Sequence, residues 1–187
     1  MCIRDRANSK SAYSFAGKKQ KFDTHIIVVW VDNEAGVLAR VVGLFSGRGY
    51  NIESLAVAEV DQKQNISRIT IVTTGTPQVV DQIKLQLKKL VPVHKVADFK
   101  REDKNVIFKE MALFKFVANN IKLSKALDAC KNFNPVLLDK TNKSKVIQIT
   151  ALRREIDNMT KNLKKFGLVS VSRTGAVAMT RGSEIFK

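Results

Sequence analysis

Apolar residues in the first half of the chain follow two spacings, one typical of strands and one of helices. Residues 25–31 (HIIVVWV) form a β-branched run that predicts a buried strand. After the polar turn 32–36, apolar residues recur at helical spacing over 35–48, and glycines end this helix. The same reasoning predicts two strands around a polar loop, a helix opened by proline and a closing strand, at residues 52–60, 68–74, 77–90 and 93–99.

The second half repeats this order of elements. Its pattern predicts a strand, a helix, two strands, a helix and a strand, at residues 106–117, 123–133, 135–139, 145–151, 153–166 and 168–173. Two successive βαββαβ units predict an α+β fold, in which each antiparallel sheet carries two helices on one face. The other face of each sheet needs a cover, so we expect dimerisation.

A charged segment without apolar anchors separates the two halves. Residues 100–105 (KREDKN) therefore predict a linker between a first domain at 23–99 and a second at 106–187. Residues 1–22 lack periodicity and are rich in Ser, Lys and Arg, so we expect a flexible tail. Met1–Arg6 fit the remainder so poorly that we do not expect them to contribute to the fold.

Composition narrows the class of protein. The 187 residues are 44% hydrophobic, which permits a packed core, and no apolar run reaches the roughly 18 residues of a membrane span. Two cysteines and the lack of a secretory signal predict a soluble protein of the reducing cytoplasm. The net charge of +16 divides into +5, 0 and +11 over residues 1–22, 23–98 and 99–187. Because most cations are lysines scattered at helix-face spacings, the charge alone does not favour a nucleic-acid partner.

No residue set indicates catalysis. His25 and His94 fall on predicted strands without a second ligand type at fixed spacing, and Cys130 lies on the apolar side of a helix, which favours a buried thiol. The acidic residues of the first half do not favour general acid–base chemistry, although they leave it open. They are Asp32, Glu34, Glu53, Glu59 and Asp61. No metal site is expected, and any function is expected to rest on binding.

One turn has the chemistry to bind a small amino acid. Residues 32–36 lead into a helix N-terminus, whose free N–H groups and dipole favour a carboxylate. Gly36 lets a ligand approach the backbone, Asn33 offers an oxygen to an ammonium group, and Val37 and Leu38 lie near enough to line an apolar pocket. The alternative interpretation is that Asn33 caps the helix and Gly36 relaxes the turn.

A long block of sequence resembles a known family. Residues 33–55 (NEAGVLARVVGLFSGRGYNIESL) resemble the signature of the small regulatory subunit of acetolactate synthase, also called acetohydroxyacid synthase. Shorter stretches resemble the same family, namely residues 67–72, 86–91, 110–113, 173–178 and 181–182. The similarity spans about residues 24–187.

The resemblance implies two ferredoxin-like βαββαβ units, the first an ACT domain. It also implies a chain without catalytic activity or cofactor of its own. Such subunits bind the catalytic large subunit, which holds thiamine diphosphate, magnesium and FAD. They activate it and confer feedback inhibition by valine in branched-chain amino-acid biosynthesis.

The resemblance further implies a valine site between two ACT domains of a homodimer. By position, Asn33, Gly36, Val37 and Leu38 would come from one chain, and Asn51 and Ile52 from the other. The chain departs from the family at Ala35 and at residues 106–109, and it matches loosely over 119–170. Two other functions stay open, an amino-acid-sensing transcription regulator and a small enzyme, although no helix-turn-helix segment is evident.

Overall fold

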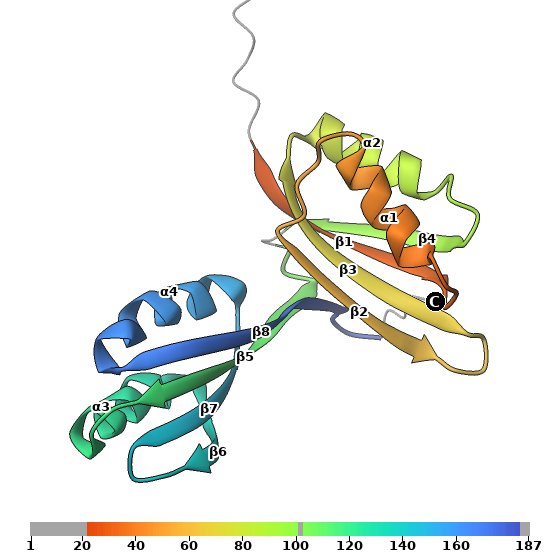
Figure 1. The fold of residues 1–187 in the computed structure, drawn as a ribbon. Helices are drawn as coiled ribbons and strands as arrows, with labels where there is room; N and C mark the ends of the chain where they lie inside the picture. The colour runs from red at the N-terminus through yellow and green to blue at the C-terminus, as the bar shows by residue number, and fades with distance from the viewer. Residues whose placement is uncertain (1–21, 101–102, 184–187) are drawn as a thin grey trace, which may run out of the picture.

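The computed structural model describes residues 22–100 and 103–183, which form two units of the same topology (Figure 1). The first unit contains an antiparallel sheet of order β2-β3-β1-β4, with both helices on one face. Its elements are β1 (Asp23–Asp32), α1 (Val37–Ser46), β2 (Ser54–Asp61), β3 (Ile66–Gly75), α2 (Pro77–Leu87) and β4 (Val93–Lys100).

The second unit has the equivalent sheet order, β6-β7-β5-β8. Its elements are β5 (Val106–Val117), α3 (Asn120–Cys130), β6 (Val136–Lys140), β7 (Ser144–Ala151), α4 (Arg153–Leu163) and β8 (Leu168–Thr180). A single 3₁₀ turn follows each helix, at Lys131–Phe133 and Lys164–Phe166. The prediction of two βαββαβ units is confirmed.

The last strand is the largest departure from the sequence prediction. We expected it to end at residue 173, but β8 continues to Thr180 and pairs with the beginning of β5 from Val106 onward. Beyond Gly175, whose φ is +82°, Ala176 and Ala178 are buried while Val177 and Met179 are exposed. This alternation is the period-2 pattern of a strand, and the sequence analysis did not use it.

The expected linker at residues 100–105 falls between β4 and β5, but residues 101 and 102 lie outside the described part of the chain. Residues 1–21 of the expected tail also lie outside it. The flexible tail and the exact division into domains therefore stay predictions.

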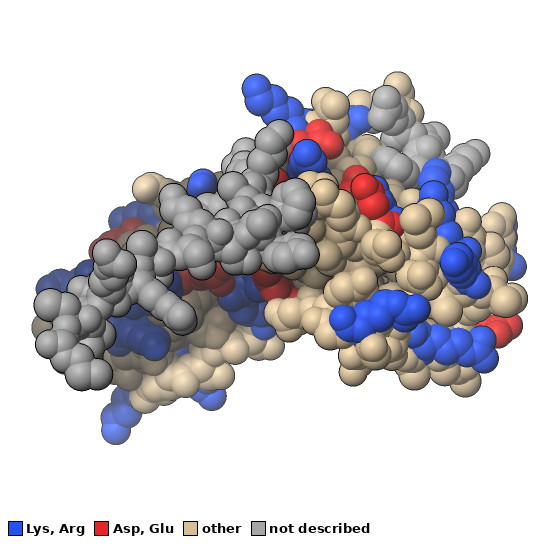
Figure 2. All heavy atoms as spheres, turned by 90° about the horizontal axis from the view of Figure 1, so that it is seen from above, with Lys and Arg blue, Asp and Glu red and all other residues tan. Residues whose placement is uncertain are grey.

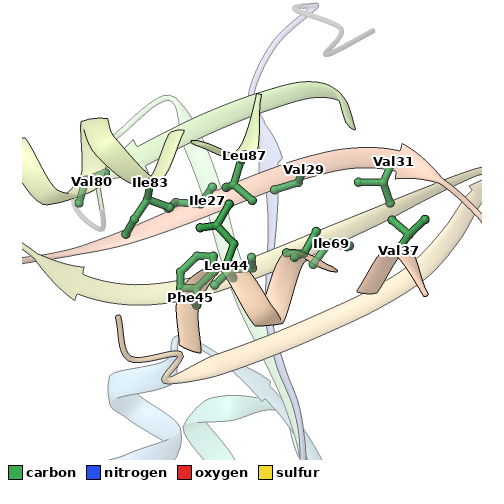
Figure 3. Packing of buried hydrophobic residues seen from close by; sticks show 12 residues of the cluster. Ile27, Val29, Val31, Val37, Leu44, Phe45, Ile69, Val80, Ile83 and Leu87 are labelled. Atoms are coloured by element: carbon green, nitrogen blue, oxygen red, sulfur yellow. The ribbon is translucent and has the colours of Figure 1, made fainter. Parts of the chain in front are cut away.

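The core of the first unit lies between its sheet and its two helices (Figure 3). Alternate residues of β1 point toward the helices, and α1 and α2 present apolar stripes to them. The fully or nearly buried members shown include Ile27, Val29, Val31, Val37, Leu44, Phe45, Ile69, Val80, Ile83 and Leu87. This packing fixes the position of the turn between β1 and α1.

A third apolar cluster joins the two units. The remaining face of β1 presents Ile26 and Val28, which pack with Val106, Ala176 and Ala178 from the projecting ends of β5 and β8. Figure 1 shows these two strands extending from the second unit toward the first. Part of the sheet face for which we expected a dimer partner is therefore covered within the chain. Because both of its faces are covered, β1 is a continuous apolar run.

Candidate functional site

The turn between β1 and α1 leaves a helix N-terminus open. Gly36 is the N-cap of α1, with φ +83°, and no side chain makes a capping hydrogen bond there. The helical ladder begins where the Arg40 N–H donates to the Gly36 carbonyl at 3.0 Å. The N–H groups of Leu38 and Ala39 precede that bond and have no place in the ladder. No heavy atom lies within 4 Å of the position that a Cβ on Gly36 would occupy.

The other three helices of the described residues carry side-chain hydrogen bonds at their N-termini. Thr76 Oγ1 accepts from the Val79 N–H at 3.4 Å on α2, and Asn119 Oδ1 accepts from the Lys122 N–H at 3.0 Å on α3. On α4 the Glu155 carboxylate accepts from the N-cap Leu152 N–H at 2.8 Å. The first-turn N–H groups of α1 therefore lack the side-chain caps found on α2 and α3. On α4 the glutamate satisfies only the N–H of Leu152, whose own side chain makes no capping hydrogen bond.

Asn33 does not cap α1, which removes the first part of the alternative interpretation. Its backbone is held by the β2–β3 loop, because its N–H donates to the Asn65 carbonyl at 2.7 Å and Asn65 Nδ2 donates back to its carbonyl at 3.2 Å. Its exposed side chain makes no hydrogen bond with the described residues. The second part is observed, since Gly36 does adopt the left-handed conformation that a turn requires of glycine.

The two apolar members of the predicted site have different surroundings. Leu38 is 40% exposed and can contact a ligand with its side chain. Val37 is 3% exposed and packs in the first core, so its side chain does not reach a ligand at this turn. Its N–H donates to the Glu34 carbonyl at 3.4 Å.

Asn51 and Ile52 lie in the loop between α1 and β2, beyond the other end of α1. A ten-residue helix spans about 15 Å at 1.5 Å per residue, so one chain does not bring these two residues to Gly36. The Asn51 carbonyl accepts from Thr73 Oγ1 at 2.7 Å, which ties the loop to β3. The six predicted residues therefore form two separate groups within a single chain.

The two histidines lie beside carboxylates. His25 Nδ1 lies 2.9 Å from an Asp98 carboxylate oxygen, and His94 Nε2 lies 2.6 Å from Asp32. Cys130 is buried, as predicted, and burial raises the pKa of its thiol to about 11. Within residues 22–100 and 103–183 there is no cluster of three or more His, Cys, Asp or Glu side chains that could hold a metal ion.

The sequence did not indicate the charged groups that meet at the junction of the two units. Arg153 of α4 contacts Glu53, which precedes β2, and the Arg68 guanidinium donates to the Ala178 carbonyl. Arg68 also lies over the Trp30 ring, 5.1 Å from its centroid, and burial lowers the pKa of Arg68. These partners are up to 110 residues apart in the sequence, so no local spacing pattern indicates them.

Charge on the visible surface is dispersed. Figure 2 shows Lys and Arg side chains spread over both units wherever undescribed residues do not cover the view. No helix among the described residues has the length and apolar character needed to cross a bilayer.

Comparison with known proteins places both units in one family. Residues 27–95 match a family described as the AHAS small subunit-like ACT domain, and residues 109–182 match the small subunit of acetolactate synthase. The acetolactate synthase small subunit of Mycobacterium bovis is 35% identical over 159 residues, covering 85% of this chain and 93% of that protein. The small subunit of Aquifex aeolicus is 37% identical over 169 residues, covering 90% of this chain and 86% of that protein.

A solved structure agrees with the sequence comparison. The crystal structure of the acetolactate synthase small subunit from Thermotoga maritima superposes with a TM-score of 0.77 at 30% identity, covering 86% of this chain and 99% of that one. The predicted resemblance is confirmed, and the first unit is an ACT domain. The chain belongs to the acetolactate synthase small-subunit family.

Proposed function

We propose that this protein is the non-catalytic regulatory subunit of a cytoplasmic acetolactate synthase. It binds the catalytic large subunit, raises its activity and makes it sensitive to valine. Thiamine diphosphate, magnesium and FAD belong to that large subunit. Membership of the small-subunit family supports the partner, and the ACT-like first unit supports a regulatory role.

L-Valine binds at the N-terminus of α1 in this proposal. The observation that carries it is the uncapped helix start at Gly36, with open space above the glycine. The backbone N–H groups of residues 36–38 hold the carboxylate, Asn33 Oδ1 accepts from the ammonium group, and Leu38 contacts the side chain. The regulatory coupling requires that valine bind one state of the complex better than the other, typically by about 1–3 kcal/mol.

A homodimer completes this site. Asn51 and Ile52 cannot reach Gly36 within one chain, so the partner subunit supplies them across an interface between two ACT domains. An isologous interface would form two such sites related by symmetry.

Calorimetric titration of L-valine into the purified chain tests the site, with D-valine as the control. We expect saturable, stereoselective binding at one or two sites per dimer. Asn51→Ala should weaken L-valine binding from the partner side, and an unchanged affinity would argue against a shared site.

Reconstitution with the cognate large subunit tests the function itself. We expect the chain to stimulate acetolactate formation and valine to reverse that stimulation. Stimulation without valine binding would retain the regulatory subunit and remove the effector site. Failure to bind the large subunit would refute the proposal as a whole.

A further inference from the structure

A cavity lies at the junction of the two units, away from the α1 turn. Its volume is about 450 Å³, within the range of roughly 300–1,000 Å³ that small-molecule sites occupy. The first unit contributes Thr24 and Glu53 to its wall, and the second contributes Lys109, Arg153 and Arg154. Three cationic side chains thus face the cavity against a single carboxylate.

The rest of the wall is apolar. Ile26 and Val72 come from the sheet of the first unit, and Phe108, Leu152 and Ala176 come from the second. A ligand that fills this space needs a negatively charged group at one end and an apolar body.

Arg153 is incompletely paired. Its Nη2 lies 3.4 Å from the Glu53 carbonyl and 3.5 Å from a Glu53 carboxylate oxygen, both long for charge-assisted hydrogen bonds. Its Nη1 is buried and has no hydrogen-bond partner among the described residues. A guanidinium presents five donors in a planar fork that matches a carboxylate, and the two donors on Nη1 are unused.

Glu53 has a second partner. Thr74 Oγ1 donates to Glu53 Oε1 at 2.5 Å, so the carboxylate keeps a hydrogen bond when Arg153 turns away. Rotation of the guanidinium toward the cavity gives up only the long Glu53 contacts.

From these contacts we infer that the junction cavity binds a small carboxylate with an apolar body, with Arg153 as its anchor. Lys109 and Arg154 add positive charge, and the ligand competes with Glu53 for the guanidinium. A carboxylate is favoured over inorganic phosphate because phosphate leaves the apolar wall unfilled.

Calorimetry with 4-methylpentanoate, which lacks the ammonium group that the α1 site requires, tests this inference separately from the valine proposal. We expect saturable binding to the full chain and none of 4-methylpentanamide, which has the same shape without the charge. Arg153→Gln should weaken binding about tenfold or more, since a hydrogen bond to a charged group stabilises by roughly 1.5–3 kcal/mol.

Two further variants separate a site from general electrostatics or loss of structure. Glu53→Gln should tighten binding, because the competing carboxylate is gone, and a purely structural Glu53–Arg153 pair predicts the opposite. Lys161→Gln removes a cation from the exposed face of α4 and should leave the affinity within about twofold.

Three results would overturn the inference. The first is that the wild-type chain does not bind 4-methylpentanoate. The second is that Arg153→Gln and Lys161→Gln weaken binding equally. The third is that inorganic phosphate binds as tightly as the carboxylate. Arg154→Gln, at an exposed position, provides a second test if Arg153→Gln does not fold, and an unchanged affinity in that variant would also contradict the inference.

Discussion

The two units share a topology but begin their first helices differently. In the second unit the chain passes from β5 to α3 through Ala118 and Asn119, and the asparagine side chain caps the helix. In the first unit a longer turn leads from β1 to α1, the N-cap is Gly36, and no side chain caps it. The same topology thus has a first helix that is capped by a side chain in one unit and uncapped in the other. Of these two, only the uncapped helix has free N–H donors for a ligand.

The two units also differ in their buried polar groups. The first unit buries His25 beside Asp98, whereas the second sheet carries a buried ion pair at its junction with α4. Glu110 is 3% exposed, and Arg173 contacts its two carboxylate oxygens at 2.6 and 2.8 Å. Arg173 also contacts Asp157 at 2.6 Å, and both carboxylates raise the pKa of the guanidinium. The second unit therefore holds an arginine between two carboxylates, where the first unit has a buried histidine beside Asp98.

Breaking that network has the largest expected effect. Arg173→Gln leaves the buried Glu110 carboxylate without its counter-ion and should lower the free energy of unfolding by about 3 kcal/mol. Chemical denaturation measures this. Asp157→Asn, at a partly exposed position, should cost less than about 1 kcal/mol. Equal losses in the two variants would show that the buried pair stabilises the fold no more than the exposed pair does.

Placing a carboxylate at the open terminus should remove effector binding. Gly36→Asp puts a negative charge where the valine carboxylate is proposed to lie, and we expect its affinity to fall about 100-fold or more. Activation of the large subunit should persist. Gly182→Asp is the matched control, because Gly182 also has a positive φ and open space around its Cβ position. Unchanged valine affinity in Gly36→Asp is the result that would refute the site.

Alanine substitutions at two asparagines compare the capped and the uncapped helix start. Asn119→Ala removes the α3 cap and should lower the free energy of unfolding by about 1 kcal/mol. Asn33→Ala removes no cap and should change stability by less than about 0.5 kcal/mol while weakening valine binding. Thermal denaturation and calorimetry together measure both effects. Equal loss of stability in the two variants would mean that Asn33 has a structural role after all.

The last prediction concerns an effect seen only at high pH, on the buried thiol of α3. Burial raises the pKa of Cys130 from 9.0 to about 11, so the unfolded chain releases this proton at lower pH than the folded one. The folded state therefore loses stability as pH rises between these two values. We expect the stability of a Cys2→Ser protein, relative to the same protein with Cys130→Ala, to fall over this range. A difference that stays constant with pH would contradict the assignment.

Much of the fold followed from local patterns. Periodicity placed every strand and helix in order, because most elements bury one face or both and repeat their apolar residues accordingly. The exception is β6, whose five residues are all exposed. Helix ends were less accurate. The two helices of the second unit finish at residues 130 and 163, followed by single 3₁₀ turns, whereas the pattern extended them to 133 and 166.

The α1 site was partly visible for the same reason. A turn, a glycine and a helix start are local features, so Asn33, Gly36 and Leu38 could be selected from the sequence. Spacing does not specify packing or backbone geometry. It therefore could not show that the Val37 side chain lies in the core, or that Asn119 caps a helix while Asn33 does not.

The sequence by itself determined the element order, the two apolar cores and the family, since these rest on neighbours in the chain and on a long contiguous block. Only the tertiary structure decided the junction between the units. There Gly175 bends β8 so that its end covers the first sheet, and Arg153 meets Glu53 across 100 residues of chain. Contacts between such distant residues arise from how whole sheets pack, and no local period of 2 or 3.6 residues encodes them.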